Sequence, residues 1–372
     1  MQKKQQPKNN TYSSYIDGSF ESRCALLFGG AGYEHSVSLA SAAGFLALLP
    51  SGVPMPLLVY ISRSGEFFIY SGDADRIADI SPEASADLLL PTYPVRLFGS
   101  GGFFVNGEVL PIKRALVLMH GDYGEDGRIQ AALELAGIEH SGADSISSAL
   151  MADKAFSLAV ARSVCVPTLD YLSFDLDLSL DLDSLIYGRV IPRAEESIGY
   201  PVFVKPCRLG SSFGAGGAEN RTELYRAIRR AFAYADRIML QPMLKDKREI
   251  ECAYFGTASG EITVSYPGEV LVGGFYGYDE KYGNNDIKIT PRADIDSSVA
   301  EEVMRYTRLL AAEMGARGCA RFDYFLVGEK IYFNEVNSIP GMTERSLYPS
   351  MLAESGVSPE RFSSELLYGG AL

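Results

Sequence analysis

Apolar residues near the N-terminus come in short, nearly unbroken runs, which is typical of strands buried on both faces of a sheet. Three such runs are CALLF (24–28), PLLVYIS (56–62) and RALVLMH (114–120). The first leads into the glycine turn GGAGYEH and a helical pattern; the third leads into GDYGEDG and a helix that closes at Gly137. Residues 66–112 predict mixed turns and short strands. The order of strand, glycine turn and helix predicts a doubly wound α/β unit.

The rest of the chain changes repeatedly between helical and strand periodicity. A helical pattern begins at Ser145 and is stopped by Pro167, whose ring cannot continue a helix. An amphipathic helix is predicted to end at Gly315. The remaining predicted elements are strands over 201–206, 237–242 and 248–256, a helix over 222–235, a glycine- and tyrosine-rich loop over 268–285, and two weak C-terminal helices.

Residues 174–183, FDLDLSLDLD, alternate large apolar side chains with aspartate or serine. This is the period of a strand with one apolar and one acidic face. A solvated edge strand, whose acids prevent edge-to-edge pairing, explains the pattern best. A calcium site is the alternative interpretation.

Two apolar runs near the C-terminus flank Gly328-Glu329-Lys330 and predict a β-hairpin over 320–337. With these three residues as the loop, Val327 pairs with Ile331. Because side chains alternate between the faces of a strand, one face of this hairpin is expected to be mostly core-like. That face holds Phe322, Tyr324, Leu326, Tyr332, Asn334 and Val336.

The other face of the hairpin is polar at one end. The same register places Asp323 opposite Glu335 and Arg321 opposite Asn337. Two carboxylates across a ladder repel each other unless a positive charge lies nearby. Arg321 supplies part of that charge, and a hard cation such as Mg²⁺ suits carboxylate and amide oxygens. A magnesium site and a surface face with an Arg–Asp pair are both compatible with the pattern.

A lysine ends the strand 201–206 and is followed by a loop of glycine and serine. Backbone N–H groups at glycines and serine hydroxyls can approach an anion closely, and Lys205 adds a point charge. The segment 205–214 therefore indicates a phosphate site, although it lacks the P-loop pattern and a flexible surface loop is the alternative. Taken alone, Lys154 in the preceding helix fits a solvated lysine.

Composition limits the classes of protein. The 372 residues are 47% hydrophobic and 22% charged, as in soluble globular proteins of two or three domains. The net charge of −13 argues against general nucleic-acid or membrane binding. Five single cysteines suggest buried thiols and not a disulfide framework or zinc site. Residues 1–22 are polar and lack a signal-peptide core, which predicts a disordered tail and a cytoplasmic location.

Eight blocks, in order along the chain, resemble the D-alanine–D-alanine ligases, which are ATP-grasp enzymes. They are LFGGAGYEHSVSL, MHGDYGEDGRIQAALELAGIEHSG, SSALMADK, FVKPCRLGSSFG, REIECA, GEV…FYGYDEKY, ARFDYF and NEVNSIPGMTERSLYP. The resemblance covers residues 24 to 365. It implies an α/β chain, α+β in part, in which a Rossmann-like domain over 23–142 precedes the ATP-grasp fold. The ATP-grasp part divides into a central subdomain over 143–240 and a C-terminal domain over 241–372 with the metal and substrate sites.

The resemblance also implies the reaction. ATP phosphorylates the carboxylate of a first D-alanine, and the amine of a second D-alanine attacks the acyl phosphate to give the dipeptide for peptidoglycan. Two Mg²⁺ ions, with Mn²⁺ as a substitute, are expected on Asp323, Glu335 and Asn337. Eight positions are implied in ATP binding: Lys154, Lys205, Ser212, Gln241, Pro242, Leu244, Glu249 and Lys281. The implied partners are D-alanine, ATP and a second copy in a homodimer, without nucleic acid or membrane.

Eight positions are implied in handling the amino acids. Glu34 is expected at the first ammonium, His120 near the first subsite, and Arg321 with the Gly341 N–H at the oxyanion. Ser346 and Leu347 are expected to bind the carboxylate of the second D-alanine. Glu34, Ser211 and Tyr282 are expected to form a hydrogen-bonded triad that orders the loop.

The sequence departs from the family pattern at a few points. Gln241 replaces the usual glutamate, so we expect altered ATP affinity, and residues 174–196 are longer and more acidic than usual. FYGYDEKY carries glycine where aspartate is common. Tyr282 matches dipeptide-forming members and favours D-alanine over D-lactate, while D-serine as second substrate stays an alternative. A non-catalytic ATP-binding protein on the same fold is the other alternative.

Overall fold

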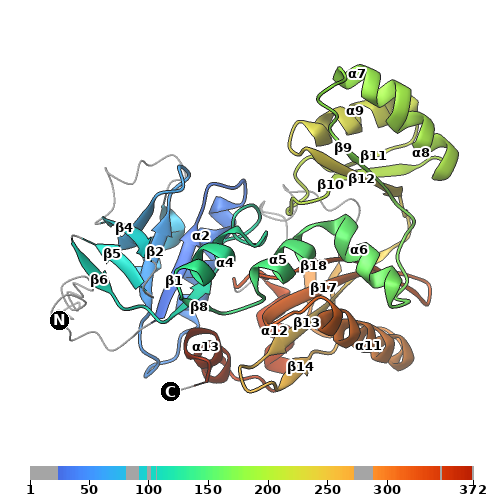
Figure 1. Cartoon of the computed structure of the whole chain (residues 1–372). Coiled ribbons are helices and arrows are strands. Elements are labelled where there is room, and N and C mark those ends of the chain that lie inside the picture. The colour runs from blue at the N-terminus through green and yellow to red at the C-terminus, as the bar shows by residue number, and fades with distance from the viewer. Residues whose placement is uncertain are drawn as a thin grey trace, which may run out of the picture.

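Three β-sheets, one after another along the chain, organise this computed structural model (Figure 1). It describes residues 24–80, 92–98, 102–105, 107–271, 288–343 and 346–370. The predicted tail and most of the loop over 268–285 lie outside the described residues, although 268–271 form a strand and not the predicted loop.

The first sheet has eight strands in the order β6-β5-β4-β3-β2-β1-β7-β8. The strands β1, β2, β7 and β8 are parallel, as the apolar runs predict, and the others extend the sheet antiparallel. The strands are β1 (Cys24–Gly29), β2 (Leu57–Ile61), β3 (Phe67–Tyr70), β4 (Thr92–Phe98), β5 (Gly102–Val105), β6 (Glu108–Leu110), β7 (Arg114–Val117) and β8 (Glu139–His140). Its helices are α2 (His35–Ala47), η1 (Ala74–Asp79) and α4 (Arg128–Leu135).

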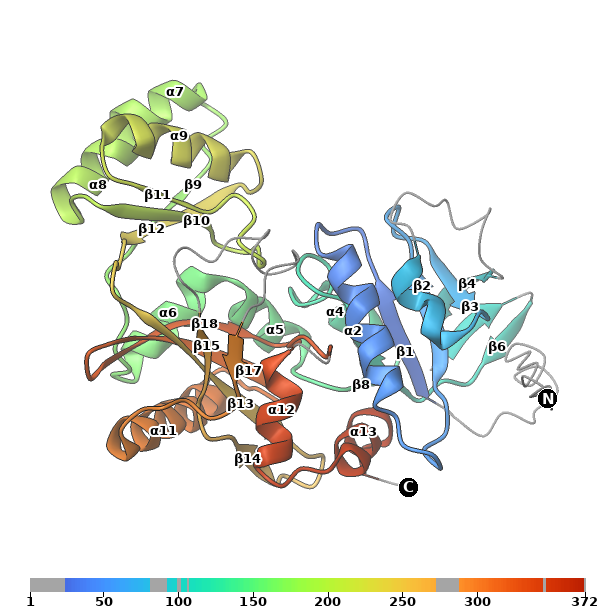
Figure 2. The same ribbon diagram turned by 180° about the vertical axis from the view of Figure 1, so that it is seen from behind.

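The second sheet is antiparallel, in the order β11-β10-β12-β9, and its helices cover one face (Figure 2). Its strands are β9 (Leu172–Asp175), β10 (Val202–Pro206), β11 (Gly216–Ala218) and β12 (Arg237–Pro242). Its helices are α7 (Leu182–Leu185), η2 (Ile186–Val190), α8 (Ile191–Ser197) and α9 (Arg221–Phe232). Apolar side chains from these helices and strands form one buried cluster.

The third sheet has the order β16-β15-β13-β17-β18, with β14 paired to β13. Its strands are β13 (Arg248–Gly256), β14 (Ile262–Val264), β15 (Gly268–Leu271), β16 (Lys288–Thr290), β17 (Gly318–Val327) and β18 (Lys330–Asn337). The helices of this region are α5 (Ser145–Ala152), α6 (Lys154–Ser163), α11 (Ser297–Glu313), α12 (Leu347–Glu354) and α13 (Pro359–Tyr368). Residues of α5, α6 and α11 share a core with this sheet.

The predicted helix from Ser145 to Pro167 is two helices. Asp153 breaks it with an extended backbone (φ −89°, ψ 107°), and its carboxylate accepts the N–H groups of Ala155 and Phe156. Aspartate satisfies the open N–H groups at the start of a helix better than it extends one. The break makes Lys154 the first residue of α6.

The leucine–aspartate stretch is an edge strand only as far as Asp175. Leu178 is 90% exposed, so the alternating apolar residues do not form one buried face. Asp177 accepts hydrogen bonds from Ser179, and Asp181 caps α7 by accepting from the N–H of Ser184. The preference of aspartate and serine for turns and caps outweighs the strand period here.

The hairpin turn has two residues and not three. Val327 pairs with Lys330, which moves the register by one near the turn. A bulge between Asp323 and Tyr324 then restores the predicted register at the polar end, where Asp323 pairs with Glu335. The shift turns Phe333 and Ile331 into the core in place of the predicted Tyr332 and Asn334, which are only half-buried.

The thiols follow the prediction at four of five positions. Cys24, Cys207, Cys252 and Cys319 are buried, whereas Cys165 is exposed beyond the end of α6.

The C-terminal helices return to the first sheet. The helix α13 lies between the first and third sheets, and the Arg114 side chain of β7 donates to its Leu366 carbonyl at 3.3 Å (Figures 1 and 2). The helix α2 approaches the segment before α12 so closely that a Cβ on Gly44 would lie 2.5 Å from the Met342 carbonyl oxygen. The helix α2 and the segment that precedes α12 are thus packed against each other.

Gly44→Ala should lower the free energy of unfolding by about 1 to 3 kcal/mol, because the backbone of Met342 cannot move away as a flexible side chain would. The matched control is Gly188→Ala, since a Cβ there meets nothing within 4 Å and alanine favours a helix. Urea unfolding followed by circular dichroism measures both. Equal stability of Gly44→Ala and wild type would contradict the close approach.

Candidate active site

Three adjacent strands place one carboxylate each on the same face of the third sheet. Asp323 on β17 lies directly opposite Glu251 on β13 and Glu335 on β18. Their side chains are 14%, 12% and 22% exposed. Such a row of acids needs positive charge close by.

Two cationic side chains compensate this row. The Arg321 guanidinium donates to both oxygens of Asp323 at 2.7 Å, and its Nε lies 3.2 Å from Glu251 Oε2. The Lys154 Nζ lies 3.1 Å from Glu335 Oε2. Asn337 donates to Asp323 at 3.0 Å. The structure therefore contains the Arg–Asp pair of one interpretation and places Asp323, Glu335 and Asn337 side by side, while their binding of magnesium stays a prediction.

Lys154 and Lys205 approach the acids from two other elements. Lys154 starts α6 and donates to the Leu209 carbonyl at 2.8 Å, and Lys205 lies on β10 and donates to Asn334 Oδ1 at 2.8 Å. Both are buried, so the expectation of a solvated Lys154 is wrong. The bulge of β18 explains the second contact, because it turns Asn334 toward Lys205.

The two lysines differ in the sign of their pKa shifts. Burial lowers the pKa of Lys205 to about 8; the repulsion of Lys154 adds to this effect, and Glu335 opposes it only in part. Burial acts on Lys154 too, but its direct contact with Glu335 outweighs that cost and the pKa of Lys154 is raised. An amide partner compensates a buried ammonium less than a carboxylate does.

Asp153 fixes the position of Lys154. Its side chain is 1% exposed, accepts from Arg208 at 2.9 Å and lies 3.2 Å from Arg237. A buried acid with two arginines at one oxygen and two backbone N–H donors at the other has little freedom to move. Sequence reasoning missed this role, although an aspartate directly before a lysine in a helical pattern is a capping signal.

Glu34 lies at the meeting point of the first and second sheets. It follows β1, is 7% exposed, and accepts a short hydrogen bond from the Ser211 hydroxyl. A Cβ on Gly121 or Gly210 would lie 2.3 Å or 2.9 Å from its carboxylate oxygens. Burial and the nearby Glu125 raise the pKa of Glu34, and the Ser211 hydrogen bond opposes them. Gly121 and Gly210 thus make room for the Glu34 carboxylate because they have no side chain.

The glycine–serine loop turns sharply over this carboxylate. Ser211 and Ser212 both have positive φ, 49° and 59°, a strained conformation for residues with a side chain. An aromatic cluster holds the loop against the first domain: Phe213 lies 5.5 Å from Tyr33 and 6.2 Å from Tyr234 between ring centroids. Tyr33 comes from the β1–α2 turn and Tyr234 follows α9. Sequence reasoning missed this contact because the three rings are distant along the chain.

His120 joins the first domain to the segment before α12. Its Nε2 lies 2.7 Å from the Ser41 hydroxyl, which also accepts from the Met342 N–H at 3.4 Å. Its Nδ1 lies 3.3 Å from Glu125. Sequence reasoning missed Ser41, whose hydroxyl is buried on α2.

Gly341, Thr343 and Ser346 lie close together in front of α12. The Ser346 hydroxyl accepts from the Thr343 N–H at 3.1 Å, and a Cβ on Gly341 would lie 2.9 Å from it. Leu347 starts α12 with its side chain buried in the core. Only the backbone of Leu347 is thus available for a ligand carboxylate, whereas Ser346 offers its hydroxyl.

The positions expected at adenine and ribose follow one another from β12 to β13. Gln241 is 3% exposed, and Pro242 ends β12. Leu244 lies in the connection to β13, where Glu249 pairs with Lys247. The Lys247 charge also lowers the pKa of Lys205, so this stretch adjoins the lysine site. Lys281 and Tyr282 lie outside the described residues.

The donor set at the acid row fits magnesium. Asp323 and Glu335 face each other, and Asn337 adjoins Asp323 through its amide nitrogen, so the three residue types that suit magnesium lie together at one partly exposed spot. In the described part of the chain, no group of three or more His, Cys, Asp or Glu residues has metal-binding geometry; this holds for the acid row as it does for residues 174–183, so the magnesium site stays a prediction. Lys154 beside Glu335 and Arg321 beside Asp323 supply the positive charge that neighbouring acids require.

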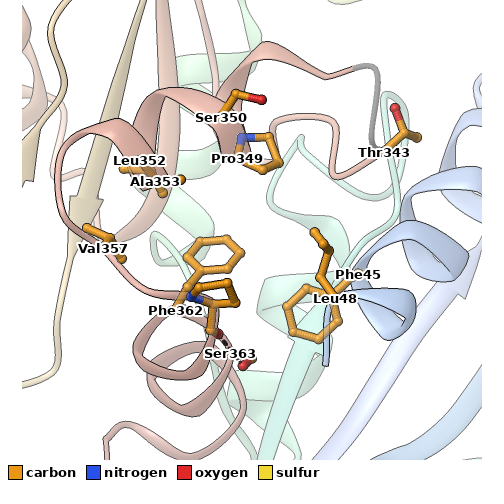
Figure 3. Close-up of a pocket in the computed structure, with 11 residues that line it drawn as sticks. Phe45, Leu48, Thr343, Pro349, Ser350, Leu352, Ala353, Val357, Phe362 and Ser363 are labelled. Carbon is orange, nitrogen blue, oxygen red and sulfur yellow. Dashed lines mark hydrogen bonds between the residues drawn. The ribbon is translucent and has the colours of Figure 1, made fainter. Parts of the chain in front are cut away.

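A cavity of about 300 Å³ lies elsewhere, between α2, α12 and α13 (Figure 3). Its lining is mainly apolar, with Phe45 and Leu48 facing Phe362 across it, and includes no ionisable side chain. Phosphate chemistry needs charged groups. The convergence of charges, and not this cavity, marks the candidate active site.

Two protein-family descriptions match the chain. "D-ala D-ala ligase N-terminus" matches residues 23–143, and "D-ala D-ala ligase C-terminus" matches residues 161–368. The chain belongs to the D-alanine–D-alanine ligase family. The family resemblance predicted from the eight sequence blocks is confirmed, and with it the ligase class.

Curated relatives of this ligase family match over nearly their whole length. The D-alanine–D-alanine ligase of Caldicellulosiruptor bescii is 32% identical over 359 residues, 93% of this chain and 94% of that protein. The one from Chlorobium chlorochromatii is 33% identical over 362 residues, 92% of this chain and 96% of that protein.

Solved structures agree on the ATP-grasp fold of the ligase family. A D-Ala:D-Ser ligase from Enterococcus faecalis has a TM-score of 0.79 at 29% identity, covering 92% of this chain and 97% of that one. The D-alanine–D-alanine ligase from Coxiella burnetii has a TM-score of 0.77 at 26% identity, covering 92% of each. The predicted fold class is confirmed. Within the described residues no helix is long and apolar enough to span a membrane.

The lowered pKa of Lys205 predicts proton uptake when this ligase binds ATP. Near pH 8 about half of Lys205 is neutral in the free enzyme. A bound phosphate favours the ammonium, so binding should take up roughly half a proton, measured by calorimetry in two buffers of different ionisation enthalpy. Lys205→Arg stays charged and should reduce the uptake. Equal uptake in both proteins would contradict the assignment.

Proposed function

We propose that this chain joins two D-alanines into D-alanyl-D-alanine for peptidoglycan, with ATP as the phosphate donor. The observation that carries the proposal is the meeting of three sets of groups: Glu34 from the first sheet, Lys154 and Lys205 from α6 and β10, and the acid row of the third sheet. Family membership supplies the reaction class.

The phosphate groups of ATP would be held by the buried lysines. Lys154 and Lys205 supply positive charge, and the loop with Ser212 covers the phosphates with N–H groups and hydroxyls. Magnesium, when bound, would be held by Asp323, Glu335 and Asn337 and would neutralise phosphate oxygens. Gln241, Pro242, Leu244 and Glu249 are assigned to adenine and ribose, and Lys281 to the transferred phosphate. Two ions, and Mn²⁺ as a substitute, belong to this proposal.

The first D-alanine would be oriented by Glu34, which accepts its ammonium, with His120 beside it. The D-alanine carboxylate attacks the γ-phosphorus of ATP; a carboxylate O–P bond forms and ADP leaves. Because Glu34 is buried and already accepts from Ser211, binding the ammonium costs little reorganisation. We assign Ser211 and Tyr282 to ordering the loop at this stage.

The second D-alanine would place its carboxylate at Ser346 and the backbone of Leu347. Its amine attacks the acyl carbon, a C–N bond forms, and the C–O bond to phosphate breaks. The developing oxyanion would be stabilised by Arg321 and the Gly341 N–H. The proton lost by the amine leaves with phosphate or solvent.

The proposal is tested by phosphate release from ATP and Mg²⁺ with D-alanine alone, with the product identified by mass spectrometry. Release together with D-alanyl-D-alanine supports it. ATP binding without release, whichever acceptor is offered, would contradict it and favour a non-catalytic ATP-binding protein.

D-Serine as the second substrate is a second candidate, since the Enterococcus faecalis structure is that of a D-Ala:D-Ser ligase. Offering D-serine or D-lactate beside D-alanine in the same assay distinguishes these products. We also propose that the chain works in the cytoplasm as a homodimer, as the family resemblance implies.

Glu335→Gln should lower kcat at least about a hundredfold with little change in thermal midpoint, because the acid is assigned to metal binding and is 22% exposed. Glu329→Gln in the exposed turn of the same hairpin is the matched control and should keep wild-type rates. Phosphate release and thermal unfolding are measured for both. A kcat of Glu335→Gln near that of wild type would show that the metal assignment is wrong.

A further inference from the structure

Arg321 has two carboxylate partners, Asp323 and Glu251. The proposed function assigns one of them, Asp323, to metal binding as well. The Arg321 guanidinium donates to Asp323 through Nε and Nη2, while Nε also lies 3.2 Å from Glu251 Oε2. Asp323 is assigned to the metal, and a carboxylate oxygen that binds a cation is a weaker acceptor for arginine. Arg321 therefore needs a second anchor at the moment when it acts.

The strand register makes Glu251 suitable for this task. Glu251 lies opposite Asp323 on β13, and Arg321 lies opposite Ala253, so Glu251 and Arg321 are diagonal neighbours on one face. Diagonal side chains on adjacent strands are within reach when they are long. Glu251 is 12% exposed and Arg321 is 20% exposed, so water screens this pair only in part.

We propose that Glu251 is a positioning residue that holds the Arg321 guanidinium toward the oxyanion when Asp323 binds magnesium. Glu251 does not itself touch the substrate or the metal in this arrangement. It acts by fixing the Nε side of the guanidinium, which leaves the Nη groups to the substrate. The inference rests on the proposed function, because the oxyanion role of Arg321 belongs to it.

Glu251 is separate from the acids assigned to metal and ribose. Asp323 and Glu335 lie on the hairpin, whereas Glu251 lies on the far side of β17 from Glu335. Glu249, two residues earlier on β13, is paired with Lys247. Alternation along the strand puts Glu249 and Glu251 on one face, which is the sequence signal for this residue.

The test compares Glu251→Gln and Glu251→Asp with a matched control. Glu269→Gln removes an acid that is also paired with an arginine, Arg248, but on the opposite face of the sheet and across β13 and β15 instead of β13 and β17. For each protein we would measure kcat, KM for ATP, the Mg²⁺ concentration for half-maximal rate, and the thermal midpoint with and without ATP and Mg²⁺.

The expected result for Glu251→Gln is a kcat lowered about tenfold to a hundredfold, because a misdirected oxyanion donor loses part of its effect. KM for ATP, the Mg²⁺ requirement and the ATP-induced thermal shift should stay within about twofold of wild type, because the nucleotide site is intact. Glu251→Asp should keep more activity than Glu251→Gln. Glu269→Gln should lower the thermal midpoint with kcat nearly unchanged.

A double variant decides whether Glu251 acts through Arg321. In Arg321→Lys, which lacks the guanidinium fork, adding Glu251→Gln should change kcat by less than about twofold. If that double variant is too slow to assay, the thermal midpoints provide the same cycle: non-additive shifts support the anchor, and additive shifts overturn it.

Several outcomes would overturn the inference. An unchanged kcat in Glu251→Gln would leave Glu251 with a structural role only. A Mg²⁺ requirement raised more than about tenfold would show that Glu251 serves the metal site, because changing even the partner of a metal ligand costs about 10- to 100-fold in metal affinity. If wild type itself forms no dipeptide, the proposed function fails, whereas an active wild type with an equally active Glu251→Gln refutes this inference alone.

Discussion

Carboxylates cannot lie side by side across a β-ladder without compensating charge, and the site depends on this constraint. Glu251, Asp323 and Glu335 stand in one row over three strands, and each is met by a lysine or an arginine. These ion pairs lie on one face of the third sheet, and their side chains keep between 10% and 22% exposure, which leaves the acids partly accessible to ligands. The same charges that stabilise the free protein are thus the groups that a metal and phosphates would bind.

Each of the three sheets supplies charged groups to the site. Lys154 is placed by the buried Asp153, and Lys205 by β10 of the second sheet. The first sheet adds Glu34, whose hydrogen bond to Ser211 fastens the glycine–serine loop. Close backbone contact between α2 and Met342 keeps the first sheet against the segment that precedes α12. A reaction that joins two small molecules and ATP needs groups from all these parts within reach of each other.

Sequence patterns predicted most elements because their apolar periods are simple. The parallel strands β1, β2 and β7 and the pairing of Asp323 with Glu335 agree with the structure. The pairing of Asp323 with Glu335 agrees only because two deviations cancel. The two-residue turn shifts the register by one, and the bulge shifts it back. A bulge leaves no clear mark on the hydrophobic pattern, so the core positions near Asn334 were mispredicted.

The other misses concern contacts between distant segments. Asp153 and the leucine–aspartate stretch were misread because capping competes with periodicity, and local pattern does not show which prevails. The burial of Lys154 follows from Glu335, some 180 residues later, and no local signal shows it. The aromatic contact of Tyr33 with Phe213 and the link from His120 through Ser41 to Met342 likewise exist only once the sheets are assembled.

The central claim is that this chain activates D-alanine as an acyl phosphate. The most direct test supplies D-alanine with ¹⁸O in both carboxylate oxygens, together with ATP and Mg²⁺, and weighs the products by mass spectrometry. The account predicts one ¹⁸O atom in each phosphate released and one retained at the new peptide carbonyl. Dipeptide formed with unlabelled phosphate would contradict it, because the carboxylate oxygen would then not have attacked the γ-phosphorus.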